Sequence, residues 1–463
     1  MSAQLDETHP SRPAMNPNEH HSPARETPVD SDIPREDSRT ETYGAGAVSK
    51  CRQLMTVLAA FTVNFTACGL LFTFGIYQAL YESMATQGSG PFIHASSSEI
   101  DLIGSLSASV MTMAAPFAVA WAKYFETPRV VWAGAVVFGL ANVAASFGTA
   151  LWHFQLAQGL LLGIGTSLSF VPSMTVTPTW FESRRGLAMG IASAGTGIGG
   201  LVWAPVVTAC IDNMGFRDTL RLTGAVAAAL IGAAGFALDW EPTTRRRLRA
   251  ESAAISPLRG LFRIPLPAWE TVKQRKFIAH ALGAAFQSAA YYTPVFYLQC
   301  VQRYWQDFNR FHADRMGRVN AFFVSTFLSA IAALGLWLPS AILGTAHEAL
   351  GKHLYISFTV LYSLFASAYV SLFPAILVEL FGVNQLPYTT GILYMAQGMA
   401  ALVGTPVAGV LIRGSANPKS SDDYTGMTIL VGALLVTASA SVAWVRCELM
   451  LTPTSEKPQK WKV

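Results

Sequence analysis

Charged side chains are scarce in this sequence. Asp, Glu, Lys and Arg make up 13% of its 463 residues, about half the share in an ordinary soluble protein, whereas 52% of the residues are hydrophobic. Apolar runs of roughly 20 residues recur with short breaks, and this length crosses about 30 Å of hydrocarbon. The composition excludes a chain of water-soluble domains and predicts a polytopic membrane protein.

Cysteine pairs, metal-binding spacings and catalytic motifs are also lacking. The five cysteines mostly lie in or beside apolar runs, and none forms a spaced pair typical of a disulfide framework or a zinc site. His347 and His353 are six residues apart, whereas a helical zinc pair needs a spacing of four. No nucleophile elbow occurs. An enzyme is therefore not expected, nor is a cofactor or a metal.

The net charge of +4 is modest, and its basic residues gather in particular loops. They do not form a face that could follow a phosphate backbone. Nucleic acid is not an expected partner.

A polar tail, residues 1–50, opens the chain. It is rich in Pro, Ser, Glu, Asp and Arg and has almost no large apolar side chains, so it is expected to be disordered. It lacks the apolar segment and cleavage site of a cleaved signal peptide, which leaves the first apolar run to direct insertion.

Six apolar runs follow in the first half and five in the second. They cover residues 54–81, 100–122, 130–149, 154–178, 186–211, 219–238, 277–301, 319–341, 354–377, 388–412 and 427–445. Lys and Arg concentrate after the even-numbered runs of the first half, which places those loops and the tail in the cytosol. The expected domains are the tail (1–50), a six-helix bundle (51–239), a basic cytosolic central loop (240–276), a second helical bundle (277–447) and a C-terminal tail (448–463).

An internal repeat relates the two halves. GIASAGTGIGGLVWAP begins at Gly190 and GILYMAQGMAALVGTP begins at Gly391. Their matching positions, which predict close helix packing, are Gly190, Gly197 and Pro205 in the first and Gly391, Gly398 and Pro406 in the second. These segments are about 200 residues apart, but the first runs of the halves are about 220 apart, and the difference equals roughly one membrane crossing. The second half is therefore expected to lack a crossing at residues 300–320, CVQRYWQDFNRFHADRMGRVN.

Three segments resemble a known family. DRMGR, residues 314–318, resembles the cytoplasmic loop motif of the major facilitator superfamily. WFESRRGLAMGIASAGTGIGG, residues 180–200, resembles the junction of spans four and five in its monocarboxylate porter branch, especially in fungal members. VELFGVNQLPYTTGILYMAQGMAALVGTPVAG, residues 378–409, is similar to spans ten and eleven of that branch. The resemblance covers about residues 50–447.

The resemblance implies twelve helices in two six-helix bundles around a central cavity, with alternating access by rocking. The chain departs from the pattern twice. SKCRQ, residues 49–53, stands where the branch has an acidic-glycine-glycine motif. The helix equivalent to span eight, which carries charged residues in carboxylate carriers of this family, is expected to be missing.

Polar side chains within the runs are candidates for substrate contact, because a buried polar group is costly in lipid and usually turns inward. The resemblance places spans one, four, seven and ten around the cavity. The candidates there are Asn64, Gln78, Gln155, Gln158, Gln287, Tyr291, Tyr292 and Tyr362. Hydrogen bonding between helices is the open alternative for each.

Two charged loop motifs are candidates for gating. In the first, Glu182 can pair with Arg184 or Arg185, and Gly186 lets the next helix approach closely; the alternative is that the arginines only anchor the topology. In the second, the resemblance favours an ionic latch. Its residues are Asp314, Arg315, Gly317 and Arg318.

No Asp, Glu, Lys or Arg lies in the middle of any run. His280 is the only central titratable candidate, and a packed surface histidine is expected there. An uncharged cavity lined by amides and aromatic rings suits a larger, partly apolar molecule better than lactate.

The central loop combines an arginine cluster with apolar positions at Leu258, Leu261, Phe262 and Ile264. This pattern fits a short segment held at the membrane surface by anionic lipids, and it fits a solvated linker equally well.

The sequence thus predicts an all-α polytopic transporter of a small organic compound, with efflux of a secondary metabolite as the first hypothesis. Proton-coupled monocarboxylate uptake and a transport-inactive, sensor-like relative are the alternatives. The expected partners are the organic substrate, the lipid bilayer and protons for coupling. The protein is expected to be a monomer in the plasma membrane.

The number of crossings decides where the C-terminus lies. Eleven crossings would put the two ends on opposite sides, whereas the twelve that the resemblance implies put both in the cytosol. We expect a tag after Val463 to resist protease added outside intact cells and to be cut after permeabilisation. Cleavage in intact cells would instead establish an odd number of crossings.

Overall fold

Helices make up all the regular secondary structure in the residues that the computed structural model describes, which are 42–88, 90–93, 95–181, 185–253, 266–297, 318–412 and 421–451. Residues Val48–Val463 form one compact unit, distinct from Met1–Ala47. The helical architecture confirms the predicted fold class. Of the tail predicted to be disordered, residues 1–41 lie outside the described residues, whereas residues 42–50 are helical and begin α1, so the prediction was wrong for them.

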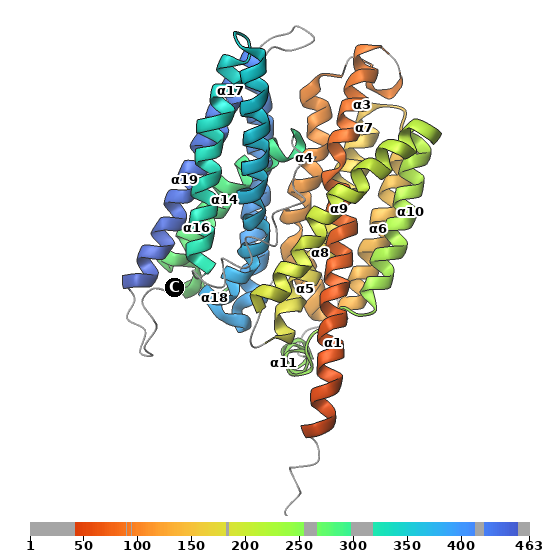
Figure 1. Cartoon of the computed structure of the whole chain (residues 1–463). Coiled ribbons are helices and arrows are strands. Elements are labelled where there is room, and N and C mark those ends of the chain that lie inside the picture. The colour runs from red at the N-terminus through yellow and green to blue at the C-terminus, as the bar shows by residue number, and fades with distance from the viewer. Residues whose placement is uncertain are drawn as a thin grey trace, which may run out of the picture. The chain divides into compact units, whose positions relative to one another are not determined.

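The first half contains six rods of helix, each matching one predicted apolar run (Figure 1). The first rod joins α1 (Thr42–Val63), η1 (Asn64–Cys68), α2 (Gly69–Phe72) and α3 (Phe74–Thr86). The second joins α4 (Ser97–Met113) and α5 (Ala115–Tyr124), and the third is α6 (Thr127–Ser146). The fourth joins α7 (Leu151–Phe154), η3 (Gln155–Leu161), α8 (Leu162–Val176) and η4 (Thr177–Trp180). The fifth and sixth are α9 (Arg185–Met214) and α10 (Phe216–Gly235).

The second half contains five rods among the described residues. They are α14 (Arg275–Tyr297), α16 (Arg318–Ala332) continued by η6 (Ala333–Trp337) and α17 (Leu338–Leu343), the two arms of α18 (Glu348–Val410), and α19 (Thr425–Leu451). Short turns of helix are η2 (Gly90–Phe92), α13 (Trp269–Val272) and η7 (Ser421–Tyr424). The stretch predicted to lack a crossing falls mostly within residues 298–317, which lie outside the described part of the chain.

Seven helical stretches of the described chain are long and apolar enough to cross a membrane, or eight if α4 and α5, which are bent by 42°, form one span. α10 packs along α6, α14 along α19, and both arms of α18 along neighbouring rods, so these helices belong to the same membrane-spanning assembly. The protein is therefore a multi-pass membrane protein. The end at which α1 begins, which the loop charges assign to the cytosol, is called the inner end below.

Local sequence signals set the ends of several helices. α4 begins with a capping box, in which Ser96 and Glu99 bond each other's backbone N–H groups. The bend between α4 and α5 lies just before Pro116, which cannot donate a backbone hydrogen bond. Gly382 divides α18 into two arms and adopts φ 75° and ψ 161°, a conformation open essentially to glycine alone.

The two halves meet where the second arm of α18 packs along α4 and α5. A Cβ atom built on Gly391 would lie 2.9 Å from Cα of Pro116, and one on Gly398 would lie 2.6 Å from the backbone oxygen of Ser109. Only glycine allows so close an approach. Two glycines of the internal repeat therefore join the halves directly.

The other repeat positions have different surroundings. Gly190 and Gly197 are buried within α9, Pro205 is exposed on the same helix, and Pro406 is half-buried in α18. On α9 it is Gly195 and Gly199 that press against the backbone of the first rod, at Phe61 and Phe65. The predicted close packing is thus present on both helices, through partly different glycines.

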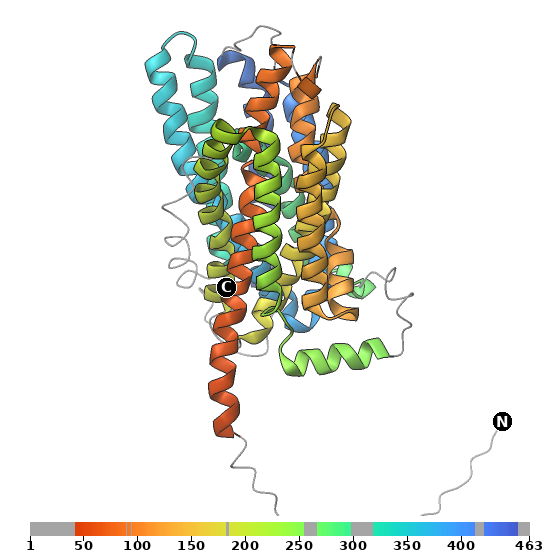
Figure 2. The ribbon, with the colours of Figure 1, turned by 90° about the vertical axis from the view of Figure 1, so that its right-hand side faces the viewer.

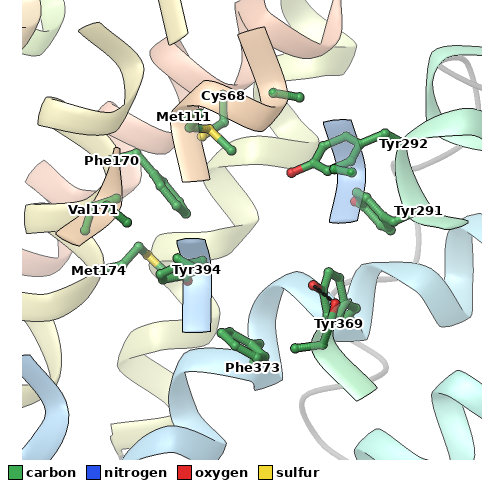
Figure 3. Packing of buried hydrophobic residues seen from close by; sticks show 14 of the residues in the cluster. Cys68, Met111, Phe170, Val171, Met174, Tyr291, Tyr292, Tyr369, Phe373 and Tyr394 are labelled. Carbon is green, nitrogen blue, oxygen red and sulfur yellow. Dashed lines mark hydrogen bonds between the residues drawn. The ribbon is translucent and has the colours of Figure 1, made fainter. Parts of the chain in front are cut away.

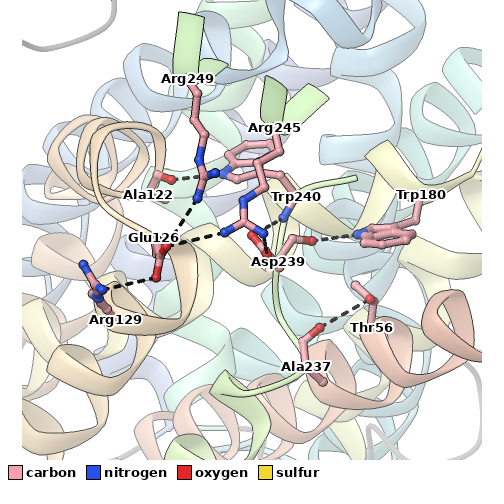
Figure 4. Close-up of polar contacts among 10 residues, drawn as sticks. All are labelled: Thr56, Ala122, Glu126, Arg129, Trp180, Ala237, Asp239, Trp240, Arg245 and Arg249. Carbon is pink, nitrogen blue, oxygen red and sulfur yellow. Dashed lines mark hydrogen bonds and ion pairs between the residues drawn. The ribbon is translucent and has the colours of Figure 1, made fainter. Parts of the chain in front are cut away.

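The first part of the central loop forms helix α11 (Pro242–Ala253), which lies crosswise at the inner end of the first-half rods (Figure 2). Arg245 pairs with Asp239 at 2.7 Å, and Arg249 pairs with Glu126 at 3.3 Å (Figure 4). Leu248 is buried in an apolar cluster with Trp240. This part of the loop is therefore a helix docked on the protein and not a solvated linker, while the interfacial segment stays a prediction. Leu258, Leu261, Phe262 and Ile264 lie outside the described residues.

Hydrogen bonds of two tryptophans close the same end. The indole N–H of Trp180 donates to the backbone oxygen of Asp239 at 2.7 Å, and that of Trp240 donates to Ala122 at 3.0 Å (Figure 4). Gln53 donates to the backbone oxygen of Trp180 at 2.7 Å. These bonds tie the inner ends of four rods together.

Replacing Gly398 by alanine is expected to weaken the contact between the halves, because the added methyl group must displace the backbone of α4. Overpacking of this kind costs roughly 1–3 kcal/mol. The matched control is Gly200→Ala, since a Cβ at Gly200 meets no atom within 4 Å. We expect the melting temperature of purified protein to fall for Gly398→Ala and to stay unchanged or rise slightly for Gly200→Ala. Equal melting temperatures for both variants would contradict the packing role of Gly398.

Candidate functional site: an aromatic cavity between the halves

A small cavity, with an accessible volume of about 40 Å³, lies between the two halves. Figure 3 shows the rings that gather around it. Its lining consists of Cys68, Phe72, Met111, Thr112, Phe170, Thr196, Tyr291, Tyr292, Tyr369, Phe373, Tyr394 and Gln397.

The spacing of aromatic residues along the helices of the second half places their rings on the faces that line this cavity. Tyr369 and Phe373 are four residues apart on the first arm of α18, so they share one face. The ring of Tyr369 lies 5.5 Å from that of Tyr291, and the ring of Phe373 lies 5.3 Å from that of Tyr394 (Figure 3). Three segments of the second half thus form a continuous aromatic wall.

The first half supplies a wall that is mostly apolar. Phe170 of α8 packs edge-on against Tyr394 at 6.1 Å, and Phe72 lies 6.3 Å from Tyr292. Cys68 is the last residue of the π-helical turn η1, which shifts the register of the first rod. Such π-helical turns are frequent at functional sites.

No Asp, Glu, Lys or Arg belongs to the described lining of the cavity. The polar groups that face it are hydroxyls, one thiol and one amide. A compact anion would need a fixed cation to offset the loss of its hydration. The arrangement can instead stack rings and make neutral hydrogen bonds.

Two of the eight predicted contact residues, Tyr291 and Tyr292, line the cavity. Gln287 lies one helical turn before Tyr291 but does not line the cavity, and neither of its side-chain polar atoms has a hydrogen-bond partner among the described residues. The hydroxyl of Tyr362 is likewise buried without a partner.

The predicted amides of the first half bond to other parts of the protein. Asn64 donates to Ala60 at 2.8 Å and accepts from Thr196 at 3.2 Å. Gln158 accepts from the hydroxyl of Tyr81 at 2.9 Å. These two side chains match the alternative in which polar groups hold the helices together.

The remaining two amides make weaker contacts. Gln78 donates to Glu82 at 3.3 Å, and Gln155 donates to the backbone oxygen of Glu99 at 3.3 Å. Neither lines the central cavity. Gln158 instead borders a second small cavity inside the first half, together with Tyr77 and Asn142.

His280 is packed, as expected, but only 2% of its surface is exposed, so the expected position at the surface was wrong. Its ring stacks on Phe373 at 5.1 Å, on the inner side of the cavity wall. The sequence did not reveal this burial, because His280 stands near the end of an apolar run, where a histidine usually faces the membrane surface.

The gating motifs are described only in part. Glu182, Arg184, Asp314, Arg315 and Gly317 lie outside the described residues, as does the side chain of Arg318, whose backbone begins α16. Arg185 donates through Nε to the backbone oxygen of Phe181, and Gly186 lies in the first turn of α9.

A contact at the inner end that sequence reasoning missed joins the two halves. Nζ of Lys123, at the end of α5, donates to the hydroxyl of Tyr388 at 2.8 Å. Nζ also lies 4.5 Å from the centre of that ring. Lys276 reaches the backbone oxygen of Leu380 at 3.2 Å within the second half.

Ten lining residues were missed. Cys68, Phe72, Phe170, Tyr369 and Phe373 lie on spans one, four and ten, where the search favoured other, mostly amide, side chains. The rest lie on spans that were not searched: Met111 and Thr112 come from α4, and Thr196 comes from α9. Tyr394 and Gln397 stand inside the repeated segment that begins at Gly391, three residues apart on one helical face. This spacing, within a segment that also carries the packing glycines, was the sequence signal that could have identified both residues as cavity residues.

Comparison with known families gives a match over most of the chain. The model of the Major Facilitator Superfamily matches residues 53–304 and 310–462. Among individual relatives, "MFS transporter asaE" of Aspergillus flavus is 26% identical over 404 residues, covering 85% of this chain and 86% of that protein. The "Fujikurins efflux protein" of Gibberella fujikuroi is 26% identical over 402 residues, covering 83% and 82%. "Monocarboxylate transporter 11" of Homo sapiens is 26% identical over 405 residues, covering 82% and 80%.

Solved structures share the fold. The proton:xylose symporter XylE superposes with a TM-score of 0.62 at 15% identity, covering 85% of this chain and 95% of that one. The human organic anion transporter MFSD10 gives a TM-score of 0.52 at 15% identity, covering 85% and 99%. At this identity the likeness concerns the fold alone.

The surroundings of Gln158 predict a structural role for it. Gln158→Ala leaves the buried hydroxyl of Tyr81 without its partner, which costs roughly 1–3 kcal/mol. Gln155→Ala is the matched control, because this amide belongs to the same π-helical turn and makes only a 3.3 Å bond near the surface. We expect a lower melting temperature for Gln158→Ala than for Gln155→Ala. A normal melting temperature combined with lost transport would instead place Gln158 in substrate binding.

Proposed function

Since the chain belongs to the major facilitator superfamily and is a transporter of a small organic compound, we propose that it exports a neutral or charge-delocalised molecule that contains rings. The observation that carries this proposal is the lining of the central cavity, which combines several aromatic rings with no charged side chain among its described residues. A secondary metabolite is the substrate class that we assign.

The contacts that the cavity offers favour a substrate with aromatic rings over a compact anion. Offset or edge-on contacts between aromatic rings contribute about 0.5–1.5 kcal/mol each beyond the burial of area. The cavity offers such partners on both sides, at Phe170 of the first half and at Tyr369 and Tyr394 of the second. A small carboxylate would gain little from them and would lose its hydration.

The names of two fungal relatives are consistent with export. One fungal relative is called an efflux protein for fujikurins, and others are called MFS transporters. These proteins are only about one quarter identical to this chain, so their substrates need not be its substrate, and the proposal rests on the cavity.

Contacts between the halves at the inner end suggest how access could alternate. The bond between Lys123 and Tyr388 and the packing of Phe170 on Tyr394 both lie across the boundary between the halves. We propose that they separate when the cavity opens to the cytosol. The motif residues Glu182, Arg184, Arg185 and Gly186, and Asp314, Arg315, Gly317 and Arg318, are proposed to assist this latch.

The organisation predicted from the sequence completes the proposal. It comprises a cytosolic tail (1–50), two helical bundles (51–239 and 277–447), a basic cytosolic loop (240–276) and a C-terminal tail (448–463). We place the protein in the plasma membrane as a monomer, with protons as the coupling ion.

The second candidate is proton-coupled uptake of a monocarboxylate. It is favoured by the similarity to human monocarboxylate transporter 11 and to bovine monocarboxylate transporter 13, which is 24% identical over 422 residues. The uncharged lining disfavours it. A transport-inactive relative that acts as a sensor is the third candidate, and the missing crossing is its only support.

Transport into inside-out vesicles separates these candidates. We expect vesicles that contain the protein to accumulate a fluorescent, uncharged aromatic compound faster than vesicles without it, and Tyr291→Ala to slow this flux without lowering the amount of protein. Excess unlabelled aromatic compound should compete, whereas lactate and pyruvate should not.

The opposite pattern would favour the second candidate, since saturation by lactate with no effect of aromatic compounds would rule out our reading of the cavity. Absence of flux for both classes would favour the sensor. Dissipating an imposed proton gradient tests the coupling ion independently of the substrate.

A further inference from the structure

Gln397 is the one amide side chain in the described lining of the central cavity. It lies on the second arm of α18, is only 3% exposed, and its amide nitrogen has no hydrogen-bond partner among the described residues. An unpartnered buried donor is destabilising, because the N–H groups lose their bonds to water. A buried group of this kind in a cavity wall calls for a partner.

Neighbouring polar groups do not supply that partner. The hydroxyl of Thr196 donates to Asn64 at 3.2 Å, and the hydroxyl of Thr112 donates to the backbone of its own helix, at 3.3 Å to Ala108 and 3.1 Å to Ser109. These hydroxyls donate their protons elsewhere, and neither of them accepts from the Gln397 nitrogen, which has no partner among the described residues. The last side-chain torsion of glutamine is broad and easily rotated, so its nitrogen can turn toward a molecule in the cavity.

The ring of Tyr394 lies one helical turn away on the same helix face, and packs against Phe170 across the cavity and against Phe373 beside it. A flat molecule that stacks within this group brings its edge next to Gln397. A donor beside a stacking surface recognises a ring that carries an acceptor on its edge.

We propose that Gln397 determines specificity by donating a hydrogen bond from its amide nitrogen to an uncharged carbonyl oxygen on the ring system of the substrate. The substrate class then narrows to aromatic or ring-fused ketones and lactones. This inference rests on the proposed function, since it takes the ring-binding role of the cavity as given.

One property, its place in the cavity wall, distinguishes Gln397 from Gln287, another buried glutamine of the second half. Gln287 is equally buried, at 1% exposed, and both of its side-chain polar atoms lack partners, but it does not line the cavity. If any unpartnered amide affected binding through stability alone, both residues would behave alike. Gln287 is thus a matched control for Gln397.

The test uses the full chain in lipid nanodiscs and two probes that differ in the carbonyl group, flavanone and flavan. Equilibrium binding of each is measured for the wild type, Gln397→Met and Gln287→Met. Methionine keeps the length of the side chain and removes the amide. Melting temperatures of the unliganded proteins are recorded to confirm that each variant folds.

We expect the wild type and Gln287→Met to bind flavanone roughly tenfold or more tightly than flavan, which is the usual discrimination by one buried hydrogen bond. Gln397→Met should bind the two probes equally, with its affinity for flavan unchanged or improved. Gln397→Asn, with a shortened amide, should show an intermediate preference if it folds.

Each other result is decisive. If Gln397→Met keeps the preference for flavanone, or if Gln287→Met loses it as well, the role of Gln397 is overturned while ring binding stands. If the wild type binds the two probes equally, the inference fails while ring binding stands; if it binds neither, the proposed function fails and the inference fails with it.

Discussion

The close approach of the second arm of α18 to α4 and α5 is the constraint on which the arrangement of this protein depends. Gly391 and Gly398 let the two backbones meet at distances that any side chain would prevent. This contact joins the halves along one side and leaves the central cavity beside it, where Met111 and Thr112 of α4 face Tyr394 and Gln397 of α18. The packing glycines and the cavity residues of α18 stand within one short segment of its second arm, so the contact places Tyr394 and Gln397 at the cavity.

A second consequence concerns polar groups within the membrane. In hydrocarbon there is no water to bond a side-chain amide or hydroxyl, so each must find a partner in the protein or in a bound molecule. The buried amides of the first half meet this demand internally, as Asn64 does with Ala60 and Thr196, and Gln158 with Tyr81. In the second half, the amides of Gln287 and Gln397 have atoms without partners among the described residues. Buried hydroxyls without such partners occur in both halves, at Ser107 and Ser193 as well as at Tyr362, so the halves differ in their amides alone.

The inner end is held by a different kind of contact. Exposed ion pairs such as that of Arg249 with Glu126 contribute little individually, about 0–1 kcal/mol. The buried indoles of Trp180 and Trp240 and the side chain of Leu248 fix α11 against the first half more firmly, because they combine apolar burial with hydrogen bonds. Only the bond between Lys123 and Tyr388 crosses to the second half there, among the polar contacts described for that end. A few polar contacts of this kind can break without unfolding either half.

The sequence by itself determined the helical class, the family and the approximate bounds of the rods. The thickness of the hydrocarbon sets the length of each run and forces its backbone to bond internally, so hydropathy alone locates α9 or α19 to within a few residues. It also indicated an uncharged cavity with Tyr291 and Tyr292. Only the tertiary structure decided that Gln158 and Asn64 bond within the first half, that His280 is buried against Phe373, and that Gln397 faces the cavity. The physical reason is that a polar side chain in a helix has the same local sequence signal whether its partner is a neighbouring helix or a substrate, and its partner is fixed by which helices lie beside it, through contacts between residues far apart in the chain.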